Sequence, residues 1–566
     1  MTKYQEIAAS MPVEDRPIPQ KEISGLGDFL GIYGGEHIAA TEFAIGASLL
    51  TLGVKATDIF IGLFFGNILA TLTYALICAP IGVDTRLTLY SYLKKVMGPY
   101  MQKIYNVIWG IASIAMAASM LSVSASALRE IFGVDLQTEW YPTDIKYVLI
   151  VLVLGIVVTL VAANGFNAVA KFSSVCIPWM IIVFAGGFFV VIPQLVQATG
   201  SESIHSIGDF LALMNNSVFT GEVVEGGSKL TVFHVAGWAW MCNLAYHGGL
   251  NDMAMFRYAK TWKYGFITAY GMYLGHFFAW ASAGIMGATA AILLNQSLLV
   301  LDSGAITNAV FGWVGLLAVV VAGWTTANPN IYRASLAYQT IFTKLDIKKL
   351  TYIIGAVATF VAFFPAASNI MSIVNMIALV VPAVGAMVIA EHWILPKIGG
   401  TRYWATFKGW KLNYAGLITW AVCLIYVAIM EVTGALHSYF LWLPEYIMAI
   451  VLYLILACAM GARNDYSEQA EEDRKVTEAL AELAENERNE VPDKVPNHPG
   501  ARKVCAWISY AILAVFAILT LAVFFGAATV EFYKTYAMVL TILYFVFGAL
   551  KTVFAYADVS VKTATV

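Results

Sequence analysis

The sequence predicts an all-α protein that crosses a membrane many times. Hydrophobic residues make up 60% of the 566 residues and charged residues only 12%, whereas soluble domains carry about a quarter charged residues. Apolar runs of roughly the 20 residues that cross a bilayer recur along the chain. Two of these runs, at Tyr33–Thr41 and Leu244–Asp252, are interrupted by a glycine pair, a histidine and carboxylates. Together these observations indicate a polytopic membrane protein with broken helices.

Ten apolar runs come first along the chain, and two pairs of runs follow. The first ten are Leu26–Gly53, Ile59–Pro80, Ile104–Leu128, Tyr147–Ala163, Phe172–Val196, Val232–Met255, Gly265–Leu294, Ile306–Ile341, Tyr352–Pro365 and Ile370–Glu391. The later pairs are Tyr414–Glu431 with Ser438–Met460, and Val504–Phe525 with Phe532–Tyr556. We therefore expect about fourteen spans, most of them close to the length that crosses a bilayer.

Positive charges between the runs predict the orientation of the chain. Most lysines and arginines between spans fall in the even-numbered loops, at Lys94, Lys95, Lys103, Lys171, Arg257, Lys260, Lys263, Lys344, Lys348, Lys349, Lys397, Arg402, Lys408 and Lys411. The odd-numbered loops are poor in positive charge, and Asp135–Asp144 and Glu202–Glu225 are acidic. Because positively charged loops stay in the cytoplasm, we expect both termini there, in a multi-pass protein of the cell's inner (plasma) membrane.

The chain is expected to have five parts. They are a cytoplasmic tail (1–25), a core of spans 1–10 (26–392), spans 11–12 (393–460), a charged cytoplasmic linker (461–503), and two additional spans with a tail (504–566). In the linker, Thr477–Glu490 favours a helix and the prolines of Val491–Gly500 end it. A solvated linker with one amphipathic helix is the simpler interpretation, and a regulatory domain is the alternative.

Several functional classes are not expected from this composition. The six cysteines lie in or beside apolar runs without paired spacing, so the sequence predicts neither disulfides nor a zinc site. The eight histidines have no metal-binding spacing. No nucleophile or cofactor motif accompanies the polar residues of the spans, so we expect neither an enzyme nor a cofactor. The net charge of −3 gives no reason to expect a nucleic-acid partner.

The first interruption places ionisable residues at the depth of the membrane. Glu36, His37 and Glu42 lie in one short stretch, and intramembrane ionisable residues are functional candidates because they are costly to bury. An unwound turn between the two glutamates would let both face one cavity, which makes all three candidates for proton or charge coupling. The alternative is structural: a carboxyl group is protonated, or it binds nearby backbone N–H groups at a helix end.

The sixth span, Val232–Met255, carries aromatic, amide and imidazole groups around the glycine pair of the second interruption. Trp240, Asn243, Tyr246 and His247 suit a flat, nitrogen-rich solute that stacks on a ring and forms hydrogen bonds at its edge. A tryptophan in a membrane protein is more often a packing or interface residue. Paired broken segments in the two halves of a long hydrophobic chain nevertheless indicate the central site of a secondary transporter.

A third polar stretch, Ala322–Tyr332, lies in the eighth span. The adjacent hydroxyls of Thr325 and Thr326, together with carbonyls freed by a broken partner helix, supply the oxygen ligands that a small monovalent cation needs. Threonines in membrane helices usually bond to their own backbone or to a neighbouring helix, and Pro329 explains a kink without any ion. The residues alone leave both interpretations open.

These residues, in this order, resemble the nucleobase:cation symporter-1 family, with its cytosine permeases and hydantoin transporters. The run Trp324–Tyr332 is similar to the family's W-T-T-N-x-N-x-x-Y stretch. Further matches, all within Leu26–Met460, are Gly53 through Asp58 to Gly66–Asn67, Ile81–Arg86, Asp252–Lys260 and Val381–Gly385. The resemblance implies a LeuT-like fold, in which five spans repeat in inverted orientation, helices 1 and 6 are broken and two spans follow. Here two extra C-terminal spans are added.

The resemblance also implies where ligands bind. A sodium ion is expected at the side chains of Thr325 and Thr326, with the carbonyls of Ala322 and of the first break, including Ala39 and Ala40. With Trp240 and His247 of the sixth span included, the expected substrate positions are Glu36, Ser113, Met116, Trp240, Asn243, Tyr246, His247 and Ala327.

Four of these positions depart from the family pattern. Met116 stands where the family has tryptophan, and Ser113 where it has glutamine. Ala327 replaces an asparagine of the family, and Glu36 replaces a glycine. A buried carboxylate favours a cationic nitrogen group, so we expect an amine-, guanidinium- or pyrimidinium-bearing solute, with nucleobases second.

The expected function is secondary uptake by alternating access. The coupling ion is expected to be Na+, with H+ as the alternative, and the partners are the small nitrogenous solute, the monovalent cation and the lipid bilayer. A sensor that does not transport, built on the same fold, is a further alternative, whereas a channel or a membrane enzyme fits the paired breaks less well.

Overall fold

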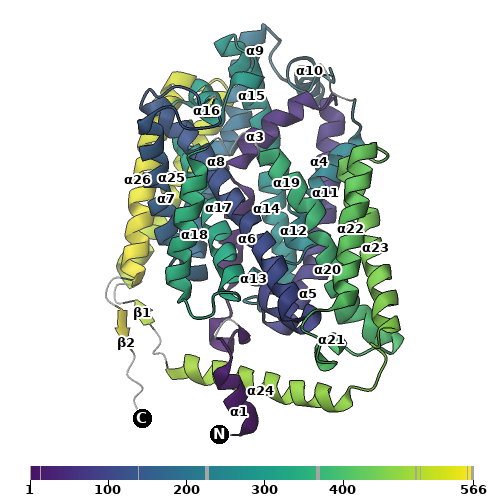
Figure 1. Ribbon diagram of the computed structural model, residues 1–566. Helices are drawn as coiled ribbons and strands as arrows, with labels where there is room; N and C mark the ends of the chain where they lie inside the picture. The colour runs from purple at the N-terminus through teal and green to yellow at the C-terminus, as the bar shows by residue number, and fades with distance from the viewer. Residues whose placement is uncertain are drawn as a thin grey trace.

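Helices of membrane length make up most of the molecule. The computed structural model describes residues 2–12, 15–137, 139–223, 229–364, 370–490, 494–496, 499–556 and 559–561. Eleven helices in these ranges are long and apolar enough to cross a membrane, and they form one bundle (Figure 1). The predicted all-α membrane architecture is therefore confirmed. The three expected spans outside the eleven are the two interrupted runs and the ninth, whose helix α18 (Ile347–Ala362) has 16 residues.

The core of the bundle extends from α2 to α20. Its other helices are α2 (Leu26–His37), α3 (Thr41–Ser48), α4 (Ala56–Thr73), α5 (Ala79–Thr85), α6 (Leu89–Ile131), α7 (Ile145–Ala162), α8 (Gly165–Phe189), α9 (Val191–Thr199), α10 (Ile207–Ser217), α11 (Val232–Met241), α12 (Leu244–His247), α13 (Met253–Phe256), α14 (Thr268–Gly271), α15 (Trp280–Leu294), α16 (Ser303–Phe311), α17 (Trp313–Gln339), α19 (Ile370–Val380) and α20 (Pro382–Ile389). Two π-helical turns, η4 (Tyr74–Cys78) and η6 (Met272–Ala279), join α4 to α5 and α14 to α15.

The first and sixth membrane segments are both discontinuous helices. In the first, α2 ends at His37 and α3 begins at Thr41. In the sixth, Asn243 and Leu250 each have a φ of 64° and separate α11, α12 and α13. A left-handed residue ends a right-handed helix, so the chain turns at both positions. Irregular backbone at membrane depth requires protein or a cavity around it, and both interruptions are buried along their whole length.

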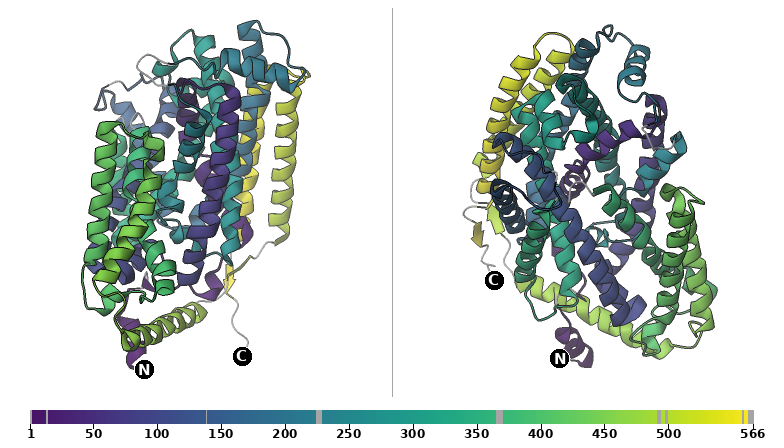
Figure 2. Two further views of the ribbon diagram at one scale, coloured as in Figure 1. Left: turned by 90° about the vertical axis from the view of Figure 1, so that its right-hand side faces the viewer. Right: turned by 45° about the horizontal axis from the view of Figure 1, so that its top comes forward.

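Burial divides the helices into a centre and a periphery. Helix α17 packs along α6 at the centre, and 89% of its membrane-spanning window is buried, against 22% for α26 (Val530–Tyr556). Figures 1 and 2 show α25 (Pro499–Phe524) and α26 on one side of the bundle and α22 (Tyr414–Thr433) with α23 (Ser438–Ala459) on the other. Most polar residues of α17 are therefore sheltered from the surroundings of the bundle.

Two predicted spans differ from the observed helices because turn residues were overlooked. The run Ile306–Ile341 is two helices, α16 and α17, since Gly312 between them has a φ of 62°. The ninth helix begins at Ile347, five residues before the predicted start, because the Asp346 side chain accepts the backbone N–H groups of the first turn. Pro365, the predicted end of that span, lies outside the described residues.

The third span begins well before its predicted start at Ile104. Helix α6 starts at Leu89 and contains a kink at Gly98, which has a φ of 77°. A Cβ atom at Gly98 would lie 2.8 Å from the Lys411 carbonyl oxygen, so both the backbone conformation and the close packing require glycine. Lys94 and Lys95, expected in a loop, instead lie on the short helical segment before this kink.

The predicted linker helix is present and lies across one end of the bundle. Helix α24 (Ser467–Glu490) starts ten residues before the predicted Thr477 and contacts α1 (Lys3–Ser10) near the N-terminus (Figure 1). Beyond it, β1 (Lys494–Pro496) pairs antiparallel with β2 (Val559–Val561), and α21 (Trp404–Phe407) precedes α22. Residues 491–493 and 497–498 of the proline-containing stretch lie outside the described residues.

Candidate functional site

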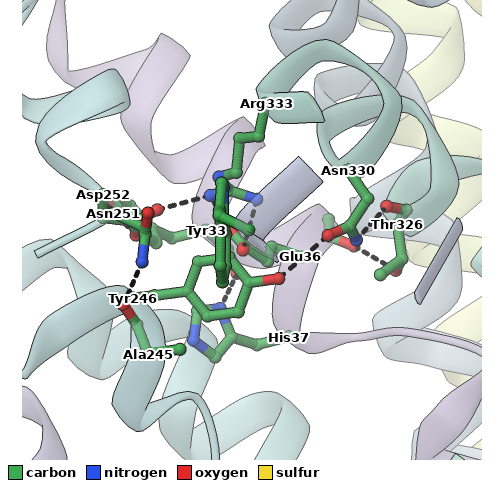
Figure 3. A network of polar contacts seen from close by, with 12 residues as sticks. Tyr33, Glu36, His37, Ala245, Tyr246, Asn251, Asp252, Thr326, Asn330 and Arg333 are labelled. Atoms are coloured by element: carbon green, nitrogen blue, oxygen red, sulfur yellow. Dashed lines mark hydrogen bonds and ion pairs between the residues drawn. The ribbon is translucent and has the colours of Figure 1, made fainter. Parts of the chain in front are cut away.

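A fully buried arginine joins both interrupted segments to the central helix. Arg333 of α17 is 0% exposed. Its Nη1 lies 2.8 Å from Oε1 of Glu36, and its Nη2 donates to Oε2 of the same carboxylate at 2.9 Å. Nη2 also forms an ion pair with Asp252, just before α13. Figure 3 shows the guanidinium between the two carboxylates, which come from the first and the sixth segments. We call Glu36, Asp252 and Arg333 the triad.

Aromatic residues complete the surroundings of the triad. The Tyr33 hydroxyl donates to Oδ2 of Asp252 at 3.1 Å. The Arg333 guanidinium carbon lies 4.6 Å from the centre of the Tyr246 ring, a cation–π arrangement. If all three charged groups are ionised, the triad carries one negative charge in excess, and an uncompensated charge is costly to bury. The triad therefore favours a cation or a proton nearby.

Because Arg333 pairs with Glu36, a cationic solute is not the only possible counter-ion of that carboxylate, and the expectation of such a solute stays a prediction. That expectation treated Glu36 as a buried carboxylate that only a solute would neutralise. The structure instead supplies the counter-ion from within the chain, at Arg333. Sequence reasoning overlooked Arg333, although an arginine inside an apolar span is itself a signal of a polar site.

The expected cation residues of α17 lie against the first break. The Thr325 hydroxyl donates to the Ala322 carbonyl at 3.0 Å. The Thr326 hydroxyl lies within hydrogen-bonding distance of two carbonyls, 3.2 Å from that of Ala322 and 3.3 Å from that of Gly35. Two hydroxyls and two carbonyls thus converge where α17 meets the end of α2. These are hard oxygen ligands of the kind that sodium takes at unwound helices.

The carbonyl that reaches Thr326 is not one of those named from the sequence. Ala39 and Ala40 use their carbonyls to accept the backbone N–H groups of Glu42, at 3.2 Å, and Phe43, at 3.3 Å. Those hydrogen bonds start α3. Gly35, four residues before Ala39, supplies the contact to Thr326 instead. The glycine also lets α2 approach α8, because a Cβ atom there would lie 2.7 Å from the Ser173 hydroxyl oxygen.

A chain of hydrogen bonds links the cation residues to the sixth segment. The Asn330 amide donates to the Thr326 carbonyl at 2.9 Å, and its oxygen accepts the Tyr246 hydroxyl at 2.9 Å (Figure 3). Through Thr326 and Gly35 the same chain reaches α2. Thr326 is therefore connected to both interrupted segments, to α2 through its hydroxyl and to α12 through its carbonyl and Asn330.

Three of the expected substrate residues line one small cavity. Met116, Asn243 and Tyr246 face it together with Leu244, Ala245, Val374, Ile377 and Ala378. Ser113 lies one helical turn before Met116 on α6 and is buried, as is Ala327 next to Thr326. The cavity is mostly apolar, with one amide and one phenol ring. Its volume is only about 20 Å³, against roughly 300–1,000 Å³ for ligand sites in general, so this region has to widen before a solute can enter.

Other predicted site residues lie away from this cavity. The Trp240 indole donates to the Thr73 hydroxyl at 3.0 Å and packs edge-on against Trp442, with ring centres 4.6 Å apart. The His247 Nε2 lies 3.1 Å from the Trp240 carbonyl. Neither residue lines the small cavity. Their contacts are those of helix packing, and they stabilise the sixth segment.

His37 and Glu42 lie in the protein interior beside the first break. The His37 Nδ1 donates to the Tyr33 carbonyl at 2.8 Å, because a carbonyl only accepts. The Glu42 carboxyl accepts the Thr41 hydroxyl at 3.3 Å, and its Oε1 is 3.9 Å from the Nε2 of His276. These contacts fit the structural interpretation of the first interruption, and they do not place either residue at the cavity.

Comparisons with known proteins identify the fold. No protein-family model and no curated protein matches the sequence. Among solved structures, the chain is similar to Mhp1, a nucleobase-cation-symport-1 family transporter, in a closed conformation with bromovinylhydantoin bound; the TM-score is 0.60, the identity 14%, and the match covers 81% of this chain and 98% of that one. An inward-facing conformation of Mhp1 matches with a TM-score of 0.56 at 13% identity, over 83% and 93% of the two chains.

A sialic acid symporter gives a further match. This Na+-coupled protein, in a substrate-bound outward-open state, has a TM-score of 0.52 at 13% identity, with 81% of this chain and 96% of that one covered. The resemblance to the nucleobase:cation symporter-1 family that the sequence indicated is thus confirmed at the level of the fold. The fold is one that these two symporters share.

Proposed function

We propose that this protein is a sodium-coupled symporter of the plasma membrane that carries a small nitrogenous solute by alternating access. The observation that carries the proposal is the hydrogen-bond chain from Gly35 through Thr326 and Asn330 to Tyr246. It connects the oxygen cluster of α17 to both interrupted segments and to the cavity. A cation bound at Thr326 would therefore order the side chain that faces the solute, which is how two sites become coupled.

Charge supports a cation at this position. The triad holds two carboxylates and one guanidinium, and Glu36 follows directly after Gly35, whose carbonyl reaches Thr326. A monovalent cation at the threonines would offset the excess negative charge over a short distance, in surroundings that screen charges weakly. The hydroxyls and carbonyls there are neutral oxygen donors, which favours Na+ over H+ as the coupling ion.

The cavity supports a neutral heterocycle as the solute. With Glu36 bound to Arg333, a cationic group on the solute would have to compete with the arginine for that carboxylate. The Asn243 amide offers both donor and acceptor groups, and once the small cavity widens, the apolar side chains of Val374, Ile377 and Ala378 would lie against a flat ring. We therefore place nucleobase-like solutes first, and amine, guanidinium and pyrimidinium compounds second.

Thermal unfolding of the purified protein tests the proposal and identifies the solute in the same experiment. A ligand that binds only the folded state raises the unfolding temperature, so sodium chloride should stabilise the protein relative to choline chloride. A panel of nitrogenous metabolites is then added with and without sodium. Compounds that stabilise only with sodium are taken into proteoliposome uptake, driven by a sodium gradient at fixed pH. Uptake that follows a pH gradient and ignores sodium would overturn the choice of ion.

A pair of matched variants locates the cation. Thr326→Val removes a hydroxyl that lies against Gly35, and should raise the sodium concentration for half-maximal stabilisation at least tenfold. Thr351→Val is the control, because that buried hydroxyl donates only to the Ile347 carbonyl of its own helix, at 2.8 Å. An equal sodium response in both variants would refute the assignment to α17.

A further inference from the structure

A vestibule lies at the end of the bundle where the N-terminus and α24 are found. Its volume is about 700 Å³. The inner wall includes Tyr332, which precedes Arg333 of the triad, and Thr351 of α18. The outer wall is made by residues 16–19 and 21–25 of the N-terminal segment and by Ala484, Glu487 and Arg488 of α24. The vestibule thus lies between the triad end of α17 and a cover formed by two segments far apart in sequence.

Polar contacts hold the two parts of the cover together. Nη1 of Arg16 lies 2.6 Å from both carboxylate oxygens of Glu487, and Arg16 is only 8% exposed. The Gln20 backbone N–H donates to Glu485 at 2.8 Å, and Lys3 binds Glu472 at 2.6 Å. Lys3 lowers the pKa of Glu472 by hydrogen bonding to its carboxylate, so this pair stays charged at neutral pH.

An apolar contact reinforces these pairs. Ala8 of α1 packs against Ala479 and Leu480 of α24, and Tyr4, Met11, Val476 and Leu483 surround them. The apolar side of the amphipathic α24 is thus covered by a segment of the same chain. The occupant of this surface is the N-terminal segment itself.

Both parts of the cover are also attached to the bundle. Lys95 of α6 binds Asp473 of α24, at 2.9 Å from Nζ to Oδ1. The N-terminal segment is bound through its backbone: Ile18 donates to the Arg86 carbonyl at 3.2 Å, and Ser24 donates to the Tyr258 carbonyl at 3.0 Å. Two residues after Ser24 the chain enters α2, which carries Gly35 and Glu36. A restraint on this segment is therefore a restraint on α2.

We propose that the N-terminal segment and α24 form a latch that partly covers the vestibule and holds α2 in place. The latch consists of the Arg16–Glu487 pair, the Gln20–Glu485 bond and the contact of Ala8 with Leu480. Breaking it lets α2 swing and opens the vestibule on that side. Pairs at a protein surface are individually weak, so the latch is reversible. The statement that opening serves transport rests on the proposed function. The contacts of the latch do not depend on it.

Cysteine labelling measures the opening directly. The reporter is Thr351→Cys, which lines the vestibule and is 2% exposed in this structure, labelled by a membrane-impermeant maleimide in open membrane fragments. We expect Glu487→Arg, which sets two cations against each other, to raise the labelling rate at least fivefold. The double variant Arg16→Glu with Glu487→Arg restores the pair in reverse and should return the rate to the parent value.

A matched control and a second readout keep the test decisive. Arg474→Glu also reverses a charge on α24, but Arg474 pairs only within its own helix, with Glu471 and Glu478, so labelling should not change. Equal rates in all variants, or a double variant as fast as Glu487→Arg, would overturn the latch. Sodium-dependent stabilisation is measured on the same proteins. Its absence throughout would refute the proposed function and leave the labelling result intact.

Discussion

At the scale of single residues, Arg333 decides how the centre of the molecule is held together. It is the counter-ion of two carboxylates that reach it from different segments, 297 and 81 residues away in the chain. Removing one partner of a buried ion pair leaves an uncompensated charge, at a cost of about 3–5 kcal/mol. The energetic importance of the triad is therefore larger than that of any surface pair in the described structure.

The first prediction concerns this arginine. Arg333→Met should lower the unfolding temperature strongly and abolish the sodium response, because Glu36 and Asp252 then repel each other in the interior. The triple variant Arg333→Met, Glu36→Gln, Asp252→Asn removes all the charges and should recover much of the lost stability. The measurement is thermal unfolding in detergent. A single variant as stable as the parent would contradict the triad as drawn in Figure 3.

The second prediction concerns the glycine that lets η6 meet the end of α2. A Cβ atom at Gly275 would overlap the His37 carbonyl, so Gly275→Ala must push α2 and η6 apart, and overpacking of this kind costs about 1–3 kcal/mol. Gly27→Ala is the control, since nothing lies within 4 Å of its Cβ position. Alanine is the better helix former by up to about 1 kcal/mol, so the control should be neutral or stabilising in the same unfolding experiment.

Residue chemistry was readable from the sequence where it depended on local order. Thr325, Thr326, Asn243 and Tyr246 follow from adjacent hydroxyls and from polar groups at a glycine break, and the structure brings these residues into one connected site. The pairing of Arg333 with two carboxylates could not be predicted, because these partners are remote in sequence. The contacts of Trp240 could not be predicted from the sequence either, because an indole ring on a broken helix can pack against any of several neighbouring helices.

At the scale of elements, the two interrupted segments are connected through α17 by the Asn330 side chain. The amide binds the Thr326 carbonyl on one side and the Tyr246 hydroxyl on the other. On the side of the sixth segment, this connection depends on one atom, the hydroxyl oxygen of Tyr246. If it is removed, the ring still lies under Arg333, so the packing of the cavity is kept while the hydrogen-bond chain is cut.

The third prediction follows from that geometry. Tyr246→Phe should reduce the ratio of solute affinities with and without sodium, because binding at Thr326 no longer orders α12. By reciprocity, the solute should also lose its effect on sodium affinity. Titration of thermal stability with both ligands measures the two ratios. Tyr273→Phe, which removes a hydroxyl bound to the Phe64 carbonyl, is the matched control, and an unchanged ratio in Tyr246→Phe would exclude the connection.

The positions of the elements were predicted better than their ends. Hydrophobic runs located the long helices, because burial and lipid contact both require apolar side chains. The ends depended on single residues that a hydrophobic average hides: Gly312 divides one run, Gly98 bends another, and Asp346 starts α18 early. The contact between α24 and the N-terminal segment could not be foreseen, since amphipathicity shows that a face is apolar without showing what covers it.

At the scale of the whole molecule, the last two helices are attached to a core that has its own centre. Helices α25 and α26 pack on the outer side of α8, where the Trp179 indole donates to the Thr541 hydroxyl at 2.8 Å and Lys534 reaches the Ala309 carbonyl at 3.1 Å. Neither helix supplies a residue to the triad, the threonine cluster or the small cavity. The expectation that they are an addition to the core stays a prediction, and it can be tested.

The fourth prediction is that the chain truncated after Glu490 keeps the sodium response. Lipid tails replace the apolar contacts of α25 and α26 at little cost, because association between membrane helices has no large hydrophobic driving force. The unfolding temperature should fall by a few degrees, since Trp179 loses its partner, while the shift produced by sodium should match that of the full chain. Thr541→Val in the full chain separates the two effects: it removes the same hydrogen bond and leaves the helices in place. A truncated protein that folds but no longer responds to sodium would mean that α25 and α26 hold α8 in the position that the cation site requires.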